Sequence, residues 1–434
     1  MANEYSVNQS DLVSIANAIR EKGSTSETLM FPSGFVSAIQ AIQAGGGGSI
    51  PKDVNFYDYD GTLLYSYTLE EAQALTALPD APAHDGLVFD GWNYSLESVK
   101  SLTRAMNIGA MYSTDDGMTR IYIHLEDGRT RPILGICPNG TVTVDWGDGT
   151  EPDTLIGTSL ATVKWTPTHN YASPGDYVIK LTVDGEAQLD GSSDFNAYSY
   201  ILRYGSDTYP RNRVYQNSIL KVEIGDGIRI GNSAFQNCSS LSNITIPHSV
   251  TSIGNYAFNS CYSLSNITIP DGVTSIGKYA FGNCSSLSNI TIPDGVTSIG
   301  SGVFSNCYSL PHIIIPDGVT SIGGSVFGNC YSLSNITIPD GMTSIRSGVF
   351  SNCYSLPHII IPDSMTSIGS NAFKNCYSMK YYDFTALTAI PTLSNTNAFT
   401  SIPADCEIRV PAALADEWKT ATNWAAHAKY IVGV

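Results

Sequence analysis

Seven of the nine cysteines recur at a fixed interval of 23 residues, and thiols are the side chains here with the widest possible chemistry. The seven are Cys238, Cys261, Cys284, Cys307, Cys330, Cys353 and Cys376. Zinc needs four convergent ligands, and no pair of these cysteines has the CxxC spacing that would supply them. The odd total argues against a full disulfide framework. We therefore expect a ladder of buried free thiols, without a metal site, a cofactor or a catalytic nucleophile.

The cysteines belong to a longer repeat, T-S-I-G-x-x-[AV]-F-x-[NS]-C-x-S-L-x-x-I-x-I-P-D-G-V. Its I-x-I alternation predicts a short strand with one buried face, and Pro-Asp-Gly predicts a turn. A coil of this length buries its apolar side chains only against its neighbours, so the pattern predicts a stacked solenoid. We expect this solenoid over residues 219–378, with 219–231 as a degenerate first coil, and a C-terminal cap over 379–434.

The repeat resembles that of the BspA-like leucine-rich repeat family, whose I-G-x-x-A-F-x-x-C-x-S-L-x-x-I-x-I-P pattern it matches almost throughout. The resemblance implies a leucine-rich-repeat solenoid. Members are commonly cell-surface or adhesive proteins, so it also implies binding to another protein or to a host surface.

Asp58 and Asp60 stand in the sequence D-Y-D-G-T, which resembles the nucleophile motif of haloacid-dehalogenase phosphatases. In that family one aspartate attacks phosphorus and its partner acts as the acid and base. The chemistry also requires a Rossmann-like core, and too few residues follow the motif to build one. We interpret the motif as a hairpin turn. Residues 51–134 then form a small α+β module, in which Phe89 to Trp92 resembles the β-grasp-like repeat of internalin-B-type surface proteins.

Three short motifs follow one another in the next part of the chain: Trp146 to Thr150 (W-G-D-G-T), His169 to Tyr171 (H-N-Y) and Gly175 to Ile179 (G-D-Y-V-I). Through these motifs, residues 135–185 resemble a PKD-type immunoglobulin-like domain. The resemblance implies a β-sandwich that serves as a spacer or a weak binding module, over residues 135–218 with its connector. Asp145 and Asp148 could offer oxygen ligands to Ca²⁺, but that ion needs six or more, so we expect them to form a turn.

The first 44 residues predict two amphipathic helices, with Leu12, Ile15 and Ile19 on one and Phe35, Ile39 and Ile42 on the other. A glycine-rich linker follows at 45–50. Residues 10–43 resemble a short segment at the N-termini of phage and prophage tail proteins. The fold class expected overall is multi-domain and mainly β, comprising the N-terminal αα-hairpin, the α+β module, the PKD-like sandwich and the capped solenoid.

Composition narrows the classes of function. The formal charge is −17 and the pI about 4.6, without a basic cluster, so binding to nucleic acid is not expected. No apolar run is long enough to span a membrane, and no secretory signal is recognisable. Residues 231–376 contain only three basic and five acidic side chains, so the repeat array is nearly neutral and the acidity lies in the flanking modules. Hydroxyl, amide and tyrosine contacts therefore fit recognition better than electrostatic steering does.

Two sets of repeated side chains are candidates for ligand binding. On the strands, alternate positions point outward, and beside the cysteines stand rigid, amphipathic tyrosines. The strand positions are Asn243, Thr245, Asn266, Thr268, Asn289, Thr291, His312, Asn335, Thr337 and His358. The tyrosines are Tyr262, Tyr308, Tyr331, Tyr354 and Tyr377. Equally, neither set could bind a ligand: the asparagines and threonines would then be the solvent-facing side chains of a β-face, and the tyrosines would cover the edges of the coils.

The leading hypothesis is a phage tail-associated adhesin or receptor-binding protein. It would dock to other tail proteins through its N-terminus, form a homo-oligomer and present the array to a host-surface protein or saccharide. Such a protein is made in the host cytoplasm and carried by the virion. The alternative is a bacterial cell-surface adhesin of the BspA-like class. A hydrolase or phosphatase rests on the D-Y-D-G-T motif alone. The receptor, the oligomeric symmetry and the tail protein contacted are left open by the sequence.

Overall fold

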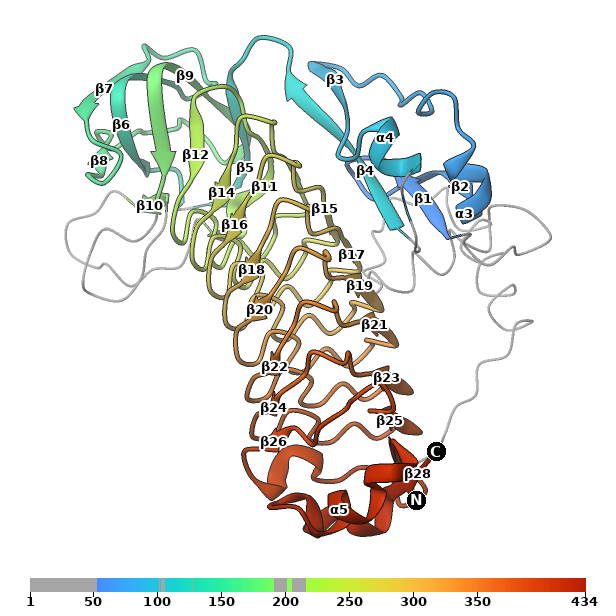
Figure 1. The fold of residues 1–434 in the computed structure, drawn as a ribbon. Coiled ribbons are helices and arrows are strands. Elements are labelled where there is room, and N and C mark those ends of the chain that lie inside the picture. Colours follow the sequence, from blue (N-terminus) through green and yellow to red (C-terminus); the bar gives the residue numbers. More distant parts are fainter. Residues whose placement is uncertain (1–52, 101, 103–105, 128, 191–200, 205–215) are drawn as a thin grey trace, which may run out of the picture. The chain divides into compact units, whose positions relative to one another are not determined.

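The computed structural model describes residues 53–100, 102, 106–127, 129–190, 201–204 and 216–434, and the chain over these residues is mainly β (Figure 1). The expected αα-hairpin at 1–44 and the linker at 45–50 lie outside the described residues. Within the described part, no helix has the length and apolar character needed to cross a membrane.

The first described module is a four-stranded sheet with strand order β2–β1–β4–β3. Its strands are β1 (Val54–Tyr57), β2 (Leu63–Tyr67), β3 (Leu87–Trp92) and β4 (Met106–Thr114). Two short helices accompany them, α3 (Leu69–Gln73) and α4 (Leu96–Lys100). A capping box between Thr68 and Glu71 begins α3. The helix ends at Gln73, and beyond it the Pro79 carbonyl accepts a hydrogen bond from Trp92 Nε1 at 2.8 Å.

A second sheet follows, built from β5 (Thr119–Leu125), β6 (Pro132–Asp145), β7 (Asp153–Thr158), β8 (Lys164–Trp165), β9 (Gly175–Leu189) and β10 (Leu202–Tyr204). The long strand β6 pairs with β7, β8, β9 and β10. Strand β5 pairs antiparallel with β9 over its whole length and also with β11. The structure thus places β5 in this second sheet. The domain boundary expected from the sequence, at residue 134, assigned it to the preceding α+β module.

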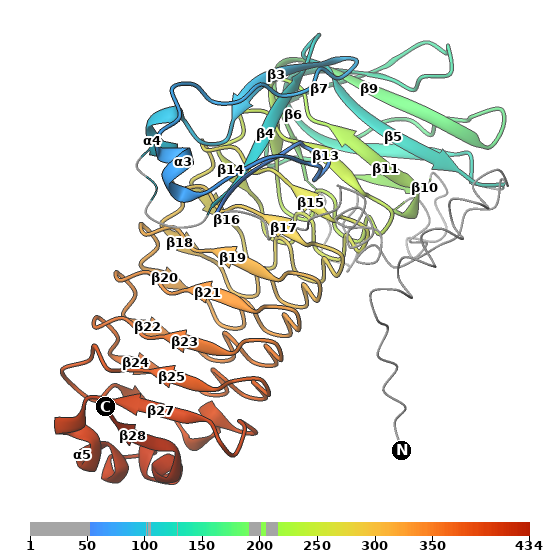
Figure 2. The same ribbon diagram turned by 90° about the vertical axis from the view of Figure 1, so that its right-hand side faces the viewer.

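The repeats form two rows of parallel strands, which Figure 2 shows stacked along the array. The first row consists of β11 (Ile219–Glu223), β13 (Asn243–Thr245), β15 (Asn266–Ile267), β17 (Asn289–Ile290), β19 (His312–Ile314), β21 (Asn335–Thr337), β23 (His358–Ile360), β25 (Tyr381–Asp383), β27 (Glu407–Val410) and β28 (Ile431–Gly433). The second row consists of β12 (Ile228–Ile230), β14 (Ser252–Ile253), β16 (Ser275–Ile276), β18 (Ser298–Ile299), β20 (Ser321–Ile322), β22 (Ser344–Ile345), β24 (Ser367–Ile368) and β26 (Thr392–Leu393). The expected β-solenoid of leucine-rich-repeat type is confirmed.

Between the two rows, each coil buries one phenylalanine and one cysteine. The phenylalanine rings stack from Phe235 to Phe373, with centroids 5.3–5.9 Å apart. Each cysteine thiol from Cys261 to Cys376 donates to the phenylalanine carbonyl of the preceding coil, at 3.2–3.3 Å. All nine cysteines are free and buried, so the predicted ladder of packed thiols is confirmed.

The residue before each of these cysteines adopts the left-handed conformation. It is Ser260 in one coil and asparagine in the others, for example Asn329 at φ 63°. Asparagine tolerates this region better than most side chains. It also links the coils, because Asn329 Nδ2 donates to Asn306 Oδ1 at 2.6 Å and Asn352 Nδ2 donates to Asn329 Oδ1 at 2.5 Å.

Both ends of the solenoid are covered. At the N-terminal end, β5 pairs with β11 of the first row and β9 pairs with β12 of the second, so the second sheet continues into the array. Exposed strand edges would otherwise invite pairing with other chains. At the C-terminal end the first row runs on through β25, β27 and β28, beyond the limit of 378 predicted for the solenoid.

The aromatic cap itself comes from α5 (Ala415–Thr420) and the 3₁₀ helix at Trp424–Tyr430. Trp418 and Trp424 are fully buried against Phe384, with ring centroids 5.2 and 5.6 Å away. The region after residue 378 therefore contributes further coils to the array as well as the aromatic cap.

The α+β module packs on the first strand row. Asn107 in β4 lies at the centre of this contact: its Nδ2 donates to Asn289 Oδ1 at 3.0 Å and to His312 Nε2 at 2.7 Å. Its carbonyl accepts from Thr291 Oγ1 at 2.7 Å. Ile314 packs against the apolar core of the module. An amide nitrogen only donates, so His312 Nε2 must accept and the ring is neutral in this arrangement.

The asparagine ladder gives a test of coil stacking. N329A should lower the free energy of unfolding by about 2–3 kcal/mol, since alanine is strained at this φ and two ladder hydrogen bonds are lost. N329G loses the same hydrogen bonds without the strain and should cost less. Urea unfolding followed by circular dichroism measures both. An N329A protein as stable as the wild type would contradict this role.

The module contact should weaken in acid. Burial lowers the pKa of His312 below 6.5, so the unfolded or undocked state binds more protons near and below that pH. The contribution of the neutral ring is complete above pH 6.5 and is lost as the pH falls through the lowered pKa. Hydrogen–deuterium exchange, corrected for intrinsic rates, should show β4 less protected at pH 5.0 than at pH 7.5. H312N, the asparagine found in neighbouring coils, should remove most of this difference; an unchanged pH dependence would count against it.

Candidate functional site

The ten strand positions proposed for ligand binding fall into a covered and an uncovered group. Thr245, Asn266 and Thr291 are buried. Asn243, Thr268, Asn289 and His312 are half-buried. Asn335, Thr337 and His358 are exposed. The division follows the α+β module, which lies over the earlier coils.

The module meets the covered group with polar contacts. Besides the bonds of Asn107, the Asn266 side chain donates to the Tyr59 carbonyl of the module at 3.1 Å. Within the array, Asn289 Nδ2 donates to Asn266 Oδ1. Gly109 of β4 lies so close to Thr268 that a Cβ at this position would collide with its side chain. Asn266, Asn289 and Thr291 are therefore already hydrogen-bonded within the same chain, and Gly109 closely approaches Thr268.

The uncovered group extends into strands that sequence reasoning placed in the cap. Next to His358 lies Tyr381 in β25, with the rings stacked at a centroid distance of 5.3 Å. Arg409 of β27 covers the Tyr381 ring at 3.9 Å and pairs with Glu407 at 2.8 Å. Ile360 of β23 is 61% exposed. We name this surface the exposed strand-face patch, made up of Asn335, Thr337, His358, Ile360, Tyr381 and Arg409.

Tyr381 and Arg409 were missed because the cysteine and S-L signals of the repeat fade after residue 378. The alternation Ile408-Arg409-Val410 keeps the I-x-I form of the first-row strands, and it was the signal that could have found them.

Four of the five proposed tyrosines form one column. The rings of Tyr308, Tyr331, Tyr354 and Tyr377 stack in succession, with centroid distances of 4.7, 4.7 and 5.1 Å. We name these four residues the tyrosine column. Tyr262 is exposed but stands apart, because Ser285 occupies the position between it and Tyr308.

The tyrosine column offers rigid rings with neutral hydroxyls. Burial raises the pKa of Tyr308, and the neighbouring tyrosines add to the shift. Tyr331 and Tyr354 each precede a first-row strand by four residues, so the column and the exposed strand-face patch lie within about 14 Å of each other along the chain. A single extended ligand could contact both.

The aspartates of the D-Y-D-G-T motif form a turn between β1 and β2. The Asp58 amide donates to the Thr62 carbonyl at 2.8 Å, and the Gly61 amide donates to the Asp58 carbonyl at 3.0 Å. Asp60 Oδ1 accepts from the Thr62 amide. Asp58 Oδ2 lies 3.0 Å from His84 Nε2. The predicted hairpin turn is confirmed, and both carboxylates are engaged in it.

The aspartates of W-G-D-G-T are also turn residues. Asp145 Oδ1 accepts from the Gly147 amide, and Asp148 Oδ1 accepts from the amide and hydroxyl of Thr150. Burial raises the pKa of the Asp148 carboxyl, but hydrogen bonds from Thr150 and His169 outweigh it, so the pKa is lower than usual. Among the described residues, no group of three or more His, Cys, Asp or Glu side chains is arranged to hold a metal ion. The predicted turn-forming role is confirmed.

The thiols of the array are poorly suited to chemistry. Burial raises the pKa of Cys284 and Cys330 to about 12, so the nucleophilic thiolate is scarce at neutral pH. Each thiol from Cys261 to Cys376 also donates to a backbone carbonyl, which leaves packing as its role.

The sequence of the array matches a known family model. The model of the BspA type leucine rich repeat region matches in six copies, over residues 209–333 and 297–410. No curated protein matches the chain significantly.

Several solved structures are similar to part of this chain. A leucine-rich repeat protein of T. pallidum is 32% identical, with 37% of this chain and 78% of that one covered and a TM-score of 0.35. One from Bacteroides ovatus is 32% identical, with 44% and 49% covered and a TM-score of 0.38. A leucine rich cell surface protein of Faecalibacterium prausnitzii is 30% identical, with 42% and 56% covered and a TM-score of 0.31.

The chain therefore spans most of the T. pallidum protein but only about half of the other two. The repeat period, the stacked coils with their phenylalanine and cysteine ladders, and the matched family model agree with one another. Through residues 209–410, the chain belongs to the BspA-type leucine-rich repeat family.

Proposed function

We propose that the protein is an adhesin whose repeat array binds a protein or saccharide on a host surface. The observation that carries this proposal is the pairing of the exposed strand-face patch with the tyrosine column. Both present aromatic, amide and hydroxyl groups on a rigid backbone, and such groups suit recognition with little loss of conformational entropy. The array has a net charge of only −2 over residues 231–376, so long-range attraction contributes little.

The flanking sheets act in this proposal as a spacer. Trp146, His169 and Tyr171, which carry the PKD resemblance, gather in one cluster: the Trp146 and His169 rings stack at 4.6 Å, and Tyr171 donates to the Trp146 carbonyl. This supports a PKD-like role for the second sheet, holding the array away from its attachment point.

The place of action is either the virion or the bacterial surface. The N-terminal resemblance to phage tail segments favours a virion, with that segment docking to other tail proteins. The BspA-type array fits a bacterial cell-surface adhesin at least as well. Co-purification with phage particles through a density gradient supports the first location. Recovery on the surface of phage-free cells supports the second and rejects the first.

Replacing two members of the tyrosine column should weaken binding. In the variant Y308A/Y354A, Tyr331 loses both stacking partners, and we expect binding to target cells to fall by about tenfold or more, as for other aromatic hot spots. The measurement is flow cytometry of fluorescently labelled full-length protein on a panel of candidate host cells. Y256A is the matched control, because Tyr256 is exposed and stacked on Tyr279 outside the column.

Thermal unfolding should be nearly unchanged in the double variant, since the removed rings lie at the surface. Wild-type binding by Y308A/Y354A would reject the tyrosine column as a recognition surface, and an equal loss in Y256A would show that the effect is unspecific.

A further inference from the structure

The residue after Ser-Ile in the second strand row is glycine in every neighbouring coil, but it is Arg346 after β22. The glycines allow close approach of coils: a Cβ at Gly277 would lie 2.5 Å from the Asn255 amide nitrogen, and one at Gly369 would lie 2.5 Å from that of Ser347. An arginine at this position cannot approach the preceding coil as closely as a glycine does.

The second strand row is interrupted at this coil. Strands β12, β14, β16, β18 and β20 are joined in one sheet, and β22, β24 and β26 form another. Between β22 and β24, the next strand of the row, the pairing is intact. The Thr366 amide donates to the Thr343 carbonyl at 2.9 Å, and the Gly369 amide donates to the Ile345 carbonyl at 2.7 Å. Over the described residues, the break between β20 and β22 is the point where the second row changes sheet.

An open depression of about 530 Å³ lies beside this break. The polar side chains that line it are those of Arg346 and five serines, Ser344, Ser347, Ser367, Ser370 and Ser394. The Ser370 hydroxyl accepts from Asn395 Nδ2 at 2.7 Å and so retains its own proton to donate. The Ser347 hydroxyl donates to the Ser370 carbonyl at 2.9 Å and can still accept. The site thus combines hydroxyls that can donate or accept with one guanidinium group.

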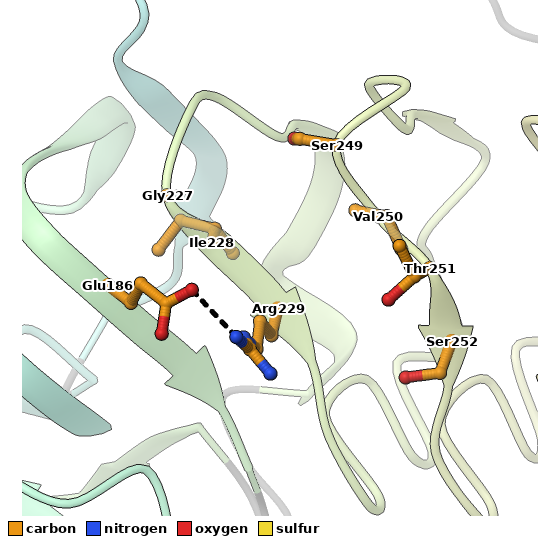
Figure 3. Close-up of a pocket in the computed structure, with 8 residues that line it drawn as sticks. All are labelled: Glu186, Gly227, Ile228, Arg229, Ser249, Val250, Thr251 and Ser252. Carbon is orange, nitrogen blue, oxygen red and sulfur yellow. Dashed lines mark hydrogen bonds and ion pairs between the residues drawn. The ribbon is translucent and has the colours of Figure 1, made fainter. Parts of the chain in front are cut away.

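A second depression on the same strand row provides a contrast. Figure 3 shows Arg229 of β12 paired with Glu186 of β9, at 2.6 Å, in a cavity of about 170 Å³ lined also by Ser249, Thr251 and Ser252. In that depression the positive charge of Arg229 is neutralised by the carboxylate of Glu186. Arg346 is exposed and forms no ion pair with any residue that the structure describes.

We propose that the depression at Arg346 binds an acidic saccharide. The guanidinium group can hold a carboxylate or sulfate with two parallel hydrogen bonds, and the surrounding serines can bond to sugar hydroxyls. A simple inorganic anion would pair with the Arg346 guanidinium group but would leave most of the surrounding serine hydroxyls without hydrogen-bond partners. The site lies on the second strand row, so it is separate from the exposed strand-face patch on the first row and does not depend on it.

The experiment is isothermal titration of the full-length protein with 3′-sialyllactose, a heparin-derived disaccharide, neutral lactose and inorganic phosphate. We expect at least one of the two acidic saccharides to bind at least tenfold more tightly than lactose or phosphate do. R346Q removes the charge and keeps a long side chain at the break, and it should weaken that binding by tenfold or more. R229Q is the matched control and should bind like the wild type.

A second variant guards against an indirect effect. R346G restores the glycine of the neighbouring coils, so it should fold at least as well as the wild type and also lose acidic-saccharide binding. Binding of neither acidic saccharide, or binding that persists in R346Q and R346G, would overturn the proposal, as would phosphate binding as tightly as the saccharides. The tyrosine variants should leave this binding intact, so failure here is distinguishable from failure of the proposed adhesin function.

Discussion

The close approach of one coil's backbone to the next is the constraint on which the rest of this structure depends. Adjacent coils are separated by about the spacing of paired strands, roughly 4.8 Å, so every side chain in the repeat meets its own equivalent. Phenylalanine rings and thiols can stack at that distance, and asparagines can bond in a ladder. A charged consensus position inside the array would place like charges in contact, which explains the low charge of residues 231–376. The repeated aspartates, such as Asp294 and Asp317, stand in exposed turns, where water screens them.

The same constraint determines what the array can offer a ligand. Most of its surface consists of columns of similar polar groups, and one partner already lies within the chain, since β4 of the α+β module contacts Asn289 and Thr291 of the earlier coils. Asn107 thereby makes the kind of contact that an external ligand would make further along the row. Under the proposed function, recognition of other molecules would be concentrated where the columns are open, in the tyrosine column and the exposed strand-face patch, and where the repeat is broken, as at Arg346.

Much of the fold was predictable because each coil repeats one local pattern. The thiol ladder, the strand at I-x-I and the hairpin turn at Asp58 follow from periodicity and turn chemistry. The contact of Asn107 with His312 could not be predicted, because it joins polar side chains 205 positions apart without any pattern. The extension of the array through Tyr381 and Arg409 was missed because the repeat loses its cysteine signal before it loses its strands. The consequence of Arg346 also needed the structure, since a glycine's role in coil spacing appears only in three dimensions.

The central claim is that the open coils of the array, and not the flanking modules, contact the receptor. Photo-crosslinking tests it most directly, because the receptor does not have to be identified beforehand. A benzophenone-bearing amino acid placed at Tyr331 in the tyrosine column should yield a covalent adduct with a target-cell component, and the same residue at the exposed Tyr65 of the α+β module should not. Adducts from Tyr65 but not from Tyr331, on cells that the protein binds, would contradict the account.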